Sequence, residues 1–391
     1  MMHRSKQSVI VVGGGTMGLA SALALAQRGY QVSVLERFEH VHTRGSHSGH
    51  TRVIRQAYHE GPHYVELVRR AWARWQVLEH GNRGSLLVPT GMLEFGHPGS
   101  PELAASIRAC ETFGIHHTCL TPAAARTRWP AFTIPERWEV CFSEAAGYLR
   151  VTACLDALRD AARAAGVTFE YGVRVRELVC GQASVRVLLE SGAVRACDRA
   201  VVCAGAYTRN LCRGVFDELL SVRRRVLAWT RPATEHRAAL AALPVWGAFT
   251  PEGFFYGFPH GDIGALGLKL ACHVPRGAPD PDVDPEQPGR EVHPQDLSPL
   301  ETFLARYLPT GVGPFAATSV CMYTCTPNDD FLIDHHPNDP RIVVASGMSG
   351  HGFKFAPVIG ELVAELVAGE SGPVPVFSRA VQLGDMHDEH G

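Results

Sequence analysis

The chain has 391 residues, a length at which two domains are expected rather than one simple core. Its formal net charge of −2 gives no excess of positive charge that would attract nucleic acid or an anionic membrane. The charged share of 19% and the apolar share of 46% are typical of a soluble globular protein.

The eleven cysteines are an odd number, are scattered along the chain and include no CxxC pair. This pattern favours reduced thiols in a cytoplasmic protein over a disulfide framework. The histidine pairs at 116–117 and 335–336 have no partner ligands at zinc-site spacing, so no metal is expected. The apolar stretch 9–26 is interrupted after four residues by a glycine cluster. That favours a strand, a turn and a helix over a membrane-spanning segment.

The first 37 residues predict a strand–helix–strand unit. The apolar run at 9–12 is typical of a buried strand, and the alanine- and leucine-rich run at 17–28 predicts a helix that Gly29 ends. A second strand is predicted at 31–35, with Glu36 at its end.

Between the first strand and the helix lies the pattern Gly13-x-Gly15-x-x-Gly18. Gly13 permits a tight turn, Gly15 lets the backbone approach a pyrophosphate, and Gly18 lets the helix pack closely on the strand. The pyrophosphate then meets the free N–H groups at the start of the helix. Because Glu36 can accept hydrogen bonds from a ribose, the whole unit predicts a dinucleotide site.

Later segments add strands of the same kind. Strands are predicted at 167–171, 185–189 and 199–202, and a strand at 342–346 is followed by a helix at 357–369. The stretch 275–288 is rich in proline and aspartate and is expected to be a surface loop. These pieces predict a nucleotide-binding domain of residues 1–86, 145–218 and 315–391, with a substrate domain of residues 87–144 and 219–314 inserted.

The glycine-rich polar segment 45–55 (GSHSGHTRVIR) carries Arg52 and Arg55, three residues apart. On one turn of a helix this spacing places both guanidinium groups on the same side. One could lie against a cofactor while the other holds a carboxylate through two hydrogen bonds. By itself the segment is also compatible with a solvated basic turn.

Polar side chains also interrupt two apolar runs in the second half of the chain. Tyr256 begins YGFP, and Lys269 and His273 lie four residues apart in GLKLACH. A lysine in such a run often buries its stem and exposes its ammonium group. The residues alone therefore leave open whether Lys269 belongs to a site.

The C-terminal part carries the most specific pattern. Cys321 opens the run CMYTCTP, and SGHGFKF, with Gly350 and Lys354, follows about thirty residues on. Together with the N-terminal glycine motif, the GSHSGHTRVIR run and the GLKLACH run, these motifs resemble the monomeric sarcosine oxidase family of amine-oxidising flavoenzymes. That family includes N-methyltryptophan oxidase and pipecolate oxidase, and the resemblance covers nearly the whole chain.

The resemblance implies an α/β (α+β) protein in which a Rossmann-like FAD-binding domain holds an inserted substrate domain built on a mixed β-sheet. It implies that Cys321 carries FAD through an 8α-S-cysteinyl thioether, and nearby cations would favour the required thiolate. Ser48 stands where the family usually has a second histidine, and this departure bears on how completely the flavin is attached. His50 stands where an aspartate or glutamine is common. The further cofactor contacts implied are Ser46, Arg52, Val175, Gly205, Gly350 and Lys354.

The catalytic residues implied by the resemblance are Lys269, Arg52, Arg55, Tyr256, His273 and Lys354. Arg55 and Lys354 would bind the carboxylate of the substrate, and Tyr256 and His273 would line its pocket. Lys269 would face the flavin, where a fixed positive charge stabilises the superoxide formed when reduced flavin passes an electron to O2.

The expected reaction is FAD-dependent oxidation of the C–N bond of an N-methyl or other secondary amino acid. Water hydrolyses the imine, and O2 reoxidises the flavin to give H2O2. No general base is required, because the amine need only bind neutral. One alternative is an oxidase or dehydrogenase of cyclic imino acids such as pipecolate, and another is a flavin-binding component with little turnover. The expected partners are the amino acid and O2, with no nucleic acid or membrane, and the protein is expected to be a monomer.

Overall fold

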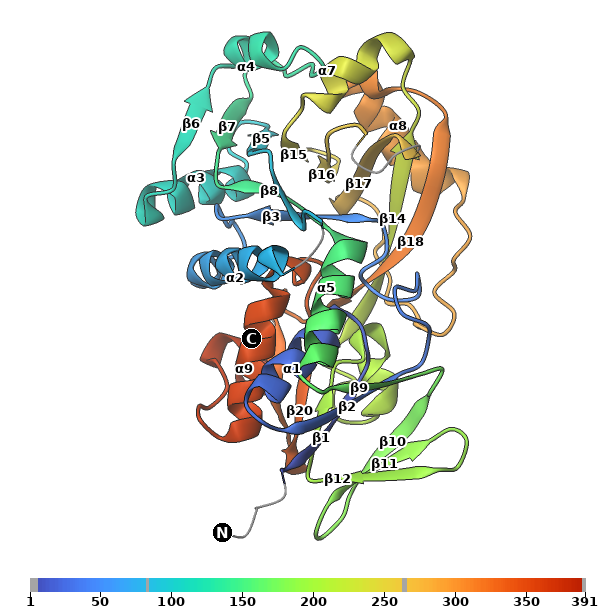
Figure 1. The fold of residues 1–391 in the computed structure, drawn as a ribbon. Coiled ribbons are helices and arrows are strands. Elements are labelled where there is room, and N and C mark those ends of the chain that lie inside the picture. The colour runs from blue at the N-terminus through green and yellow to red at the C-terminus, as the bar shows by residue number, and fades with distance from the viewer. Residues whose placement is uncertain (1–5, 82–83, 262–265, 389–391) are drawn as a thin grey trace.

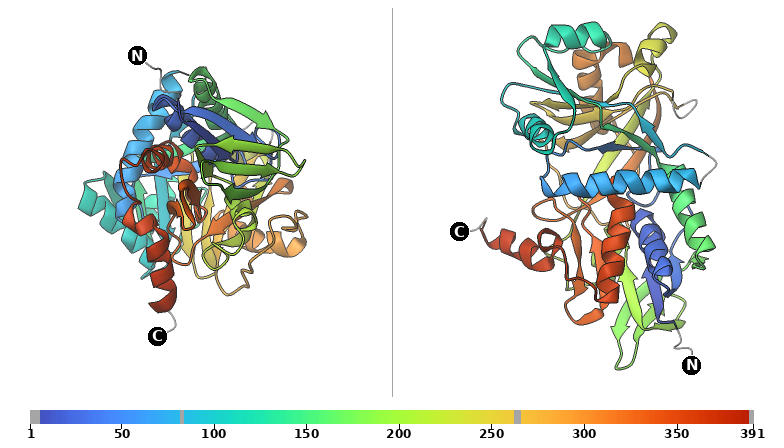
Figure 2. Two further views of the ribbon diagram at one scale, coloured as in Figure 1. Left: turned by 90° about the horizontal axis from the view of Figure 1, so that it is seen from below. Right: turned by 60° about the vertical axis from the view of Figure 1, so that its left-hand side comes forward.

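The computed structural model describes residues 6–81, 84–261 and 266–388. Figure 1 shows two stacked parts, the lower one built on a six-stranded sheet and the upper one on an eight-stranded sheet. Helix α2 (His63–His80) crosses between them, as the right-hand view of Figure 2 also shows. None of the helices in the described ranges is long and apolar enough to cross a membrane.

The six-stranded sheet of the lower part has the strand order β19-β20-β13-β1-β2-β9. All neighbouring strands are parallel except β19, which runs antiparallel to β20. In chain order these strands are β1 (Ser8–Val12), β2 (Gln31–Glu36), β9 (Thr168–Tyr171), β13 (Arg199–Val202), β19 (Leu332–His336) and β20 (Asp339–Ser346).

Strand β1 is apolar from Val9 to Val12 because both faces of its sheet are covered. Val9 and Val11 belong to the core formed with helices α1 (Thr16–Gln27), α5 (Val151–Ala164) and α9 (Ala356–Ala368). Ile10 and Val12 belong to a second core on the opposite face. A small antiparallel sheet covers that face, made of β10 (Val175–Cys180), β11 (Val185–Leu189) and β12 (Val194–Cys197). A strand buried on both sides reads as a continuous apolar run, and the predicted strand–helix–strand unit is confirmed.

The eight-stranded sheet of the upper part has the order β18-β14-β17-β16-β15-β5-β7-β6. These strands are β5 (Met92–Gly96), β6 (His117–Leu120), β7 (Glu139–Ser143), β14 (Ser221–Thr230), β15 (Val245–Thr250), β16 (Gly253–Gly257), β17 (Leu268–Pro275) and β18 (Phe315–Cys325). One face packs its apolar side chains, such as Trp246 and Leu270, against helices α4 (Pro122–Arg128), α7 (Arg237–Ala241) and α8 (Pro294–Tyr307). Since side chains alternate along a strand, Lys269 and Cys321 lie on the other face, which is turned toward the lower part.

Helix α3 (Pro101–Phe113) carries local signals at both ends. The Ser100 side chain caps its start by accepting the Leu103 N–H, and Gly114 ends it at φ 61°. The remaining regular elements are β3 (Thr51–Arg55), β4 (Leu87–Pro89), β8 (Ala146–Arg150), α6 (Thr208–Leu211) and α10 (Arg379–Asp388). Strands β3, β8 and β4 form a small sheet at the junction of the two parts.

The helical turn expected for Arg52 and Arg55 is not formed, because both residues lie in strand β3. Side chains three residues apart on a strand point to opposite faces. The expectation that the two guanidinium groups share one side is therefore wrong. Arg52 extends toward Cys321, and Arg55 extends toward Glu60.

Strands β14 and β18 form one continuous antiparallel ladder, from the pair Ser221–Cys325 to the pair Thr230–Phe315. The predicted boundaries at residues 219 and 315 assign these two strands to different domains. That division stays a prediction, and any boundary drawn there cuts through a hydrogen-bonded sheet. Because β18 carries Cys321, the ladder makes this cysteine part of the upper sheet, on the same face as Lys269.

Candidate active site

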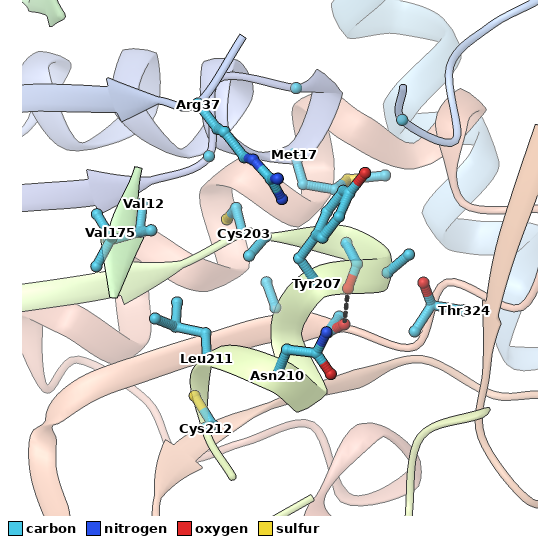
Figure 3. Close-up of a pocket in the computed structure, with 18 of the residues that line it drawn as sticks. Val12, Met17, Arg37, Val175, Cys203, Tyr207, Asn210, Leu211, Cys212 and Thr324 are labelled. Atoms are coloured by element: carbon cyan, nitrogen blue, oxygen red, sulfur yellow. Dashed lines mark hydrogen bonds between the residues drawn. The ribbon is translucent and has the colours of Figure 1, made fainter. Parts of the chain in front are cut away.

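A cavity of about 770 Å³ follows the C-terminal ends of β1, β2 and β13. Figure 3 shows Val12 and Val175 close together in its wall, and Arg37 and Tyr207 projecting into it. Most of the predicted cofactor contacts line this cavity: Gly13, Gly15, Glu36, Ser46, Arg52, Val175, Gly205 and Gly350. Gly18, Cys321 and Lys354 are not among the residues that line it.

The glycines of the N-terminal motif are needed for close backbone contacts. Gly13 has φ 104°, and a Cβ there would lie 2.4 Å from the carbonyl oxygen of Cys203. A Cβ on Gly18 would lie 1.8 Å from the carbonyl oxygen of Gly13. Gly15 is the N-cap of α1, so no side chain caps this helix, and its first turn contains no acidic residue. The free N–H groups therefore remain open to a phosphate anion.

Glu36 lies at the edge of the cavity, as predicted. Its carboxylate accepts the N–H of Gly14 at 2.6 Å and the N–H of Phe38 at 2.8 Å. Burial raises the pKa of Glu36, and these two N–H groups partly offset that effect. The backbone thus holds the carboxylate in one orientation, in which it can accept hydrogen bonds from ribose hydroxyls.

Two further observations fit a large planar and polar ligand. Gly350 has φ 79°, and a Cβ there would lie 2.4 Å from the Tyr323 ring, so only glycine lets this segment pass so closely. His47 lines the cavity, and its buried Nε2 has no hydrogen-bond partner among the described residues. Burial lowers the pKa of His47 to about 3, so this imidazole is neutral. The cavity, its glycine turn and its unpaired polar atom together fit FAD.

Cys321 is fully buried next to the cavity. Its Sγ lies 3.4 Å from the carbonyl oxygen of Ser46 and 3.7 Å from Nη2 of Arg52. The Arg52 guanidinium also donates to the carbonyl oxygens of Ser46, Ser48 and Thr51. Arg52 therefore holds the loop of residues 46–51 in place and keeps a positive charge beside the sulfur.

Lys269 is 3% exposed, which excludes a surface lysine. Its Nζ donates to the carbonyl oxygens of Gly49 at 2.6 Å and Thr51 at 2.8 Å, and to Oγ1 of Thr51 at 3.1 Å. Burial and the nearby Arg52 lower its pKa. The three acceptors nevertheless match the three N–H bonds of an ammonium group. Lys269 is thus a fixed amine between the loop and the rings of Phe258 and Trp229.

Arg55 and Lys354 meet at Tyr58. The guanidinium carbon of Arg55 lies 4.5 Å from the centroid of the Tyr58 ring, and Nζ of Lys354 lies 5.1 Å from it. Nζ of Lys354 also donates to the Tyr58 hydroxyl oxygen at 3.1 Å and to the carbonyl oxygen of His351 at 2.9 Å. Residues almost three hundred positions apart in the sequence therefore lie against the same ring, and their role as a carboxylate site stays a prediction.

The carboxylate of Glu60 is paired with Arg55. Nη2 of Arg55 donates to both oxygens of Glu60, at 2.8 and 2.7 Å. Although burial opposes ionisation of Glu60, the charges of Arg55 and its neighbours outweigh it and hold the pKa of Glu60 well below its usual value. Burial and the charge of Arg55 lower the pKa of Lys354 to about 7. Arg55 therefore holds an internal carboxylate, that of Glu60.

The remaining predicted residues, Tyr256 and His273, form an aromatic cluster with Tyr323. His273 Nδ1 lies 3.1 Å from the Tyr323 hydroxyl oxygen, and the Tyr256 and His273 ring centroids are 6.2 Å apart. Burial lowers the pKa of His273 well below its usual value, so its imidazole is neutral. Since Tyr323 also lines the cavity, this cluster reaches the cavity wall.

Three residues of the site are missing from the sequence prediction: Tyr58, Glu60 and Tyr323. Tyr323 had a usable signal, because it lies two positions after Cys321 and strand alternation places both on one face. Tyr58 and Glu60 follow Arg55 in a segment with no distinctive spacing, and only the folded chain brings them to Lys354.

Comparison with known proteins shows which family the chain resembles. Residues 8–366 match the model of a family described as FAD dependent oxidoreductase. The monomeric sarcosine oxidase of Bacillus sp. (strain B-0618) is 35% identical over 360 residues, which cover 92% of this chain and 91% of that one. The N-methyl-L-tryptophan oxidase of Yersinia pestis (strain Pestoides F) is 31% identical over 369 residues, covering 94% and 96% of the two chains.

Two solved structures are similar in fold to this chain. NikD, an unusual amino acid oxidase essential for nikkomycin biosynthesis, matches with a TM-score of 0.82 and 26% identity over 95% of this chain and 98% of that one. Amadoriase I of Aspergillus fumigatus matches with a TM-score of 0.80 over 98% and 92% of the two chains. Its identity of 22% shows a shared fold alone.

Proposed function

The chain belongs to the FAD dependent oxidoreductase family, and from this premise we propose that it oxidises the C–N bond of N-methyl or other secondary amino acids. The products are an imine, which water hydrolyses, and H2O2. The observation that carries this proposal is that Arg55 and Lys354, both buried, lie against one ring, Tyr58, and that Arg55 already holds a carboxylate, that of Glu60.

In this proposal Arg55 and Lys354 bind the carboxylate of the amino acid, and Glu60 gives up its contact with Arg55 when the substrate enters. Fixing the carboxylate holds the reacting carbon in one orientation, which removes much of the entropic cost of the reaction. The aromatic cluster of Tyr256, His273 and Tyr323 then limits where the amine can lie.

The chain needs no general base for this reaction. Burial keeps His273 neutral, so it adds no positive charge beside the amine, and because its pKa is lowered well below its usual value it is a weak proton acceptor. The substrate amine binds in its neutral form and keeps the lone pair that supports oxidation.

FAD, when bound, supplies the redox chemistry by accepting a hydride equivalent from the substrate and passing electrons to O2. The residues that would hold it are the glycine turn of residues 13–18, Glu36 and Arg52, with Cys321 as the covalent attachment point. The short distances from the Cys321 sulfur to Ser46 and Arg52, both of which line the cavity, support this attachment. Lys269 would contribute a fixed positive charge during the reaction with O2.

The proposal is tested by mixing the purified yellow protein with sarcosine, N-methyltryptophan, proline and pipecolate and measuring H2O2. Peroxide release with at least one of these, and none with the matching primary amino acid, is expected. If pipecolate reduces the flavin but air does not reoxidise it, the result would favour a dehydrogenase of cyclic imino acids over an oxidase. No reduction by any secondary amino acid would refute the proposed function. We also propose that the protein is cytoplasmic and monomeric. Size-exclusion chromatography of the purified protein tests whether it is a monomer.

A further inference from the structure

Arg225 is a buried arginine that none of the roles above uses. It lies on β14 and is 7% exposed. Its guanidinium forms two hydrogen bonds of 2.6 Å with the two carboxylate oxygens of Asp280, one from each terminal nitrogen. Its Nε donates to the carbonyl oxygen of His273 at 2.7 Å. One side chain thus joins a surface segment to a residue of the substrate pocket.

The strand is irregular at His273. In the pairing of β16 with β17, Phe254 pairs with Val274 but Phe255 pairs with Cys272, so His273 is an extra residue between two regular pairs. Such a β-bulge changes the direction of a side chain and leaves the extra residue outside the ladder. Arg225 therefore binds the backbone of β17 at His273, the residue that lies outside the regular pairing with β16.

Arg225 also contacts the hydrogen-bond partner of His273. Its guanidinium carbon lies 5.3 Å from the centroid of the Tyr323 ring, a cation–π arrangement. Tyr323 in turn bonds Nδ1 of His273 at 3.1 Å and lines the cofactor cavity. Backbone and ring contacts from a single guanidinium thus determine how the imidazole and the phenol face each other.

We propose that Arg225, held in place by Asp280, is a positioning residue that aligns the His273–Tyr323 pair for catalysis. This inference rests on the proposed amine oxidation and adds to it a residue that touches neither substrate nor cofactor. It also assigns a role to the proline- and aspartate-rich stretch 275–288, which supplies Asp280 and thereby supports the active site from outside.

A purely structural role is the competing explanation, because an ion pair of this kind could simply tie the stretch 275–288 to the sheet. The chain offers a matched control at the neighbouring position. Arg224 bonds both oxygens of Asp296 at 2.7 and 3.0 Å, with side chains 19% and 17% exposed. Since adjacent residues of a strand point to opposite faces, Arg224 reaches neither His273 nor Tyr323.

The experiment compares Arg225→Gln with Arg224→Gln in the flavin-loaded protein, measuring kcat, KM, flavin content and thermal melting. Arg225→Gln is expected to lower kcat by about 10- to 100-fold at unchanged flavin content, the scale for a misaligned active site. Arg224→Gln is expected to change kcat by less than about 3-fold even if it lowers the melting temperature equally. Arg225→Lys should not restore kcat, because an ammonium group cannot reproduce the planar fork.

Similar kcat values in Arg225→Gln and Arg224→Gln, or a loss of kcat that only follows a loss of flavin, would overturn the positioning role. If Arg225→Gln does not fold, Asp280→Asn tests the proposal instead. This variant keeps Arg225 but weakens its ion pair with residue 280, which is partly exposed. A smaller but measurable fall in kcat supports the proposal, and wild-type kcat in Asp280→Asn refutes it. A wild-type protein that oxidises no secondary amino acid would instead refute the proposed function.

Discussion

Replacing Glu60 by glutamine tests whether an internal carboxylate competes with the substrate for Arg55. Nη2 of Arg55 donates to both oxygens of Glu60 at 2.8 and 2.7 Å, and both side chains are largely buried. A substrate carboxylate can form its own contact with Arg55 only when this one is broken. The substitution should therefore strengthen the binding of carboxylate ligands.

The size of the effect follows from the difference between a charged and a neutral partner. A hydrogen bond to a charged group contributes about 1.5–3 kcal/mol and a neutral one about 1 kcal/mol. Glutamine keeps a neutral hydrogen bond to Arg55, so breaking this contact would cost about 0.5–2 kcal/mol less than breaking the contact with Glu60. The affinity for a carboxylate ligand should therefore rise by roughly 2- to 30-fold. The effect applies throughout the neutral pH range, because the pKa of Glu60 lies well below its usual value.

The assay is a titration of the flavin-loaded protein with a carboxylate inhibitor such as methylthioacetate, followed by the flavin absorbance. Glu361→Gln is a suitable control, because Glu361 of α9 also pairs with arginines, Arg70 and Arg74 of α2, and neither arginine is a residue of the site. An inhibitor affinity in Glu60→Gln that is unchanged or weaker than in wild type would refute the competition.

Other predictions concern the remaining charged and covalent groups. Cys321→Ala should release flavin into the supernatant after acid precipitation, whereas the wild-type pellet should stay yellow; complete release from wild type would exclude covalent attachment. Arg55→Met should weaken carboxylate inhibitors by roughly 10- to 150-fold, equivalent to about 1.5–3 kcal/mol, and equal affinity would exclude the contact. Because burial lowers the pKa of Lys354 to about 7, its positive charge is lost as the pH rises through that value. Inhibitor affinity should therefore fall there, and Lys354→Met should remove this pH dependence. Lys269→Met should slow reoxidation by O2 by about 10²- to 10³-fold and leave reduction by substrate nearly unchanged in anaerobic stopped-flow; wild-type reoxidation in this variant would remove Lys269 from the mechanism.

Features that depend on local chain geometry could be predicted from the sequence. The run at 9–12 is apolar at every position because both faces of β1 are buried, and Gly13 and Gly18 are required by backbone contacts within the same turn and its neighbouring strand. Ser100 and Gly114 mark the ends of α3 for the same local reason. The resemblance carried by the CMYT run then identified the cofactor class without any knowledge of the fold.

The tertiary structure alone decided which of these groups meet. The spacing of Arg52 and Arg55 suggested one shared side, but a strand conformation sends them to opposite faces, and spacing cannot reveal which conformation the chain adopts. The contact of Glu60 with Arg55 and that of Arg225 with His273 depend equally on the folded chain. They arise because a loop folds back on β3 and because the carbonyl group of His273, at a bulge in β17, lies within reach of Arg225 on β14. Strand register and bulges are set by the packing of the whole sheet. The sequence could therefore indicate which residues belong to the site, but it could not indicate which of them contact each other.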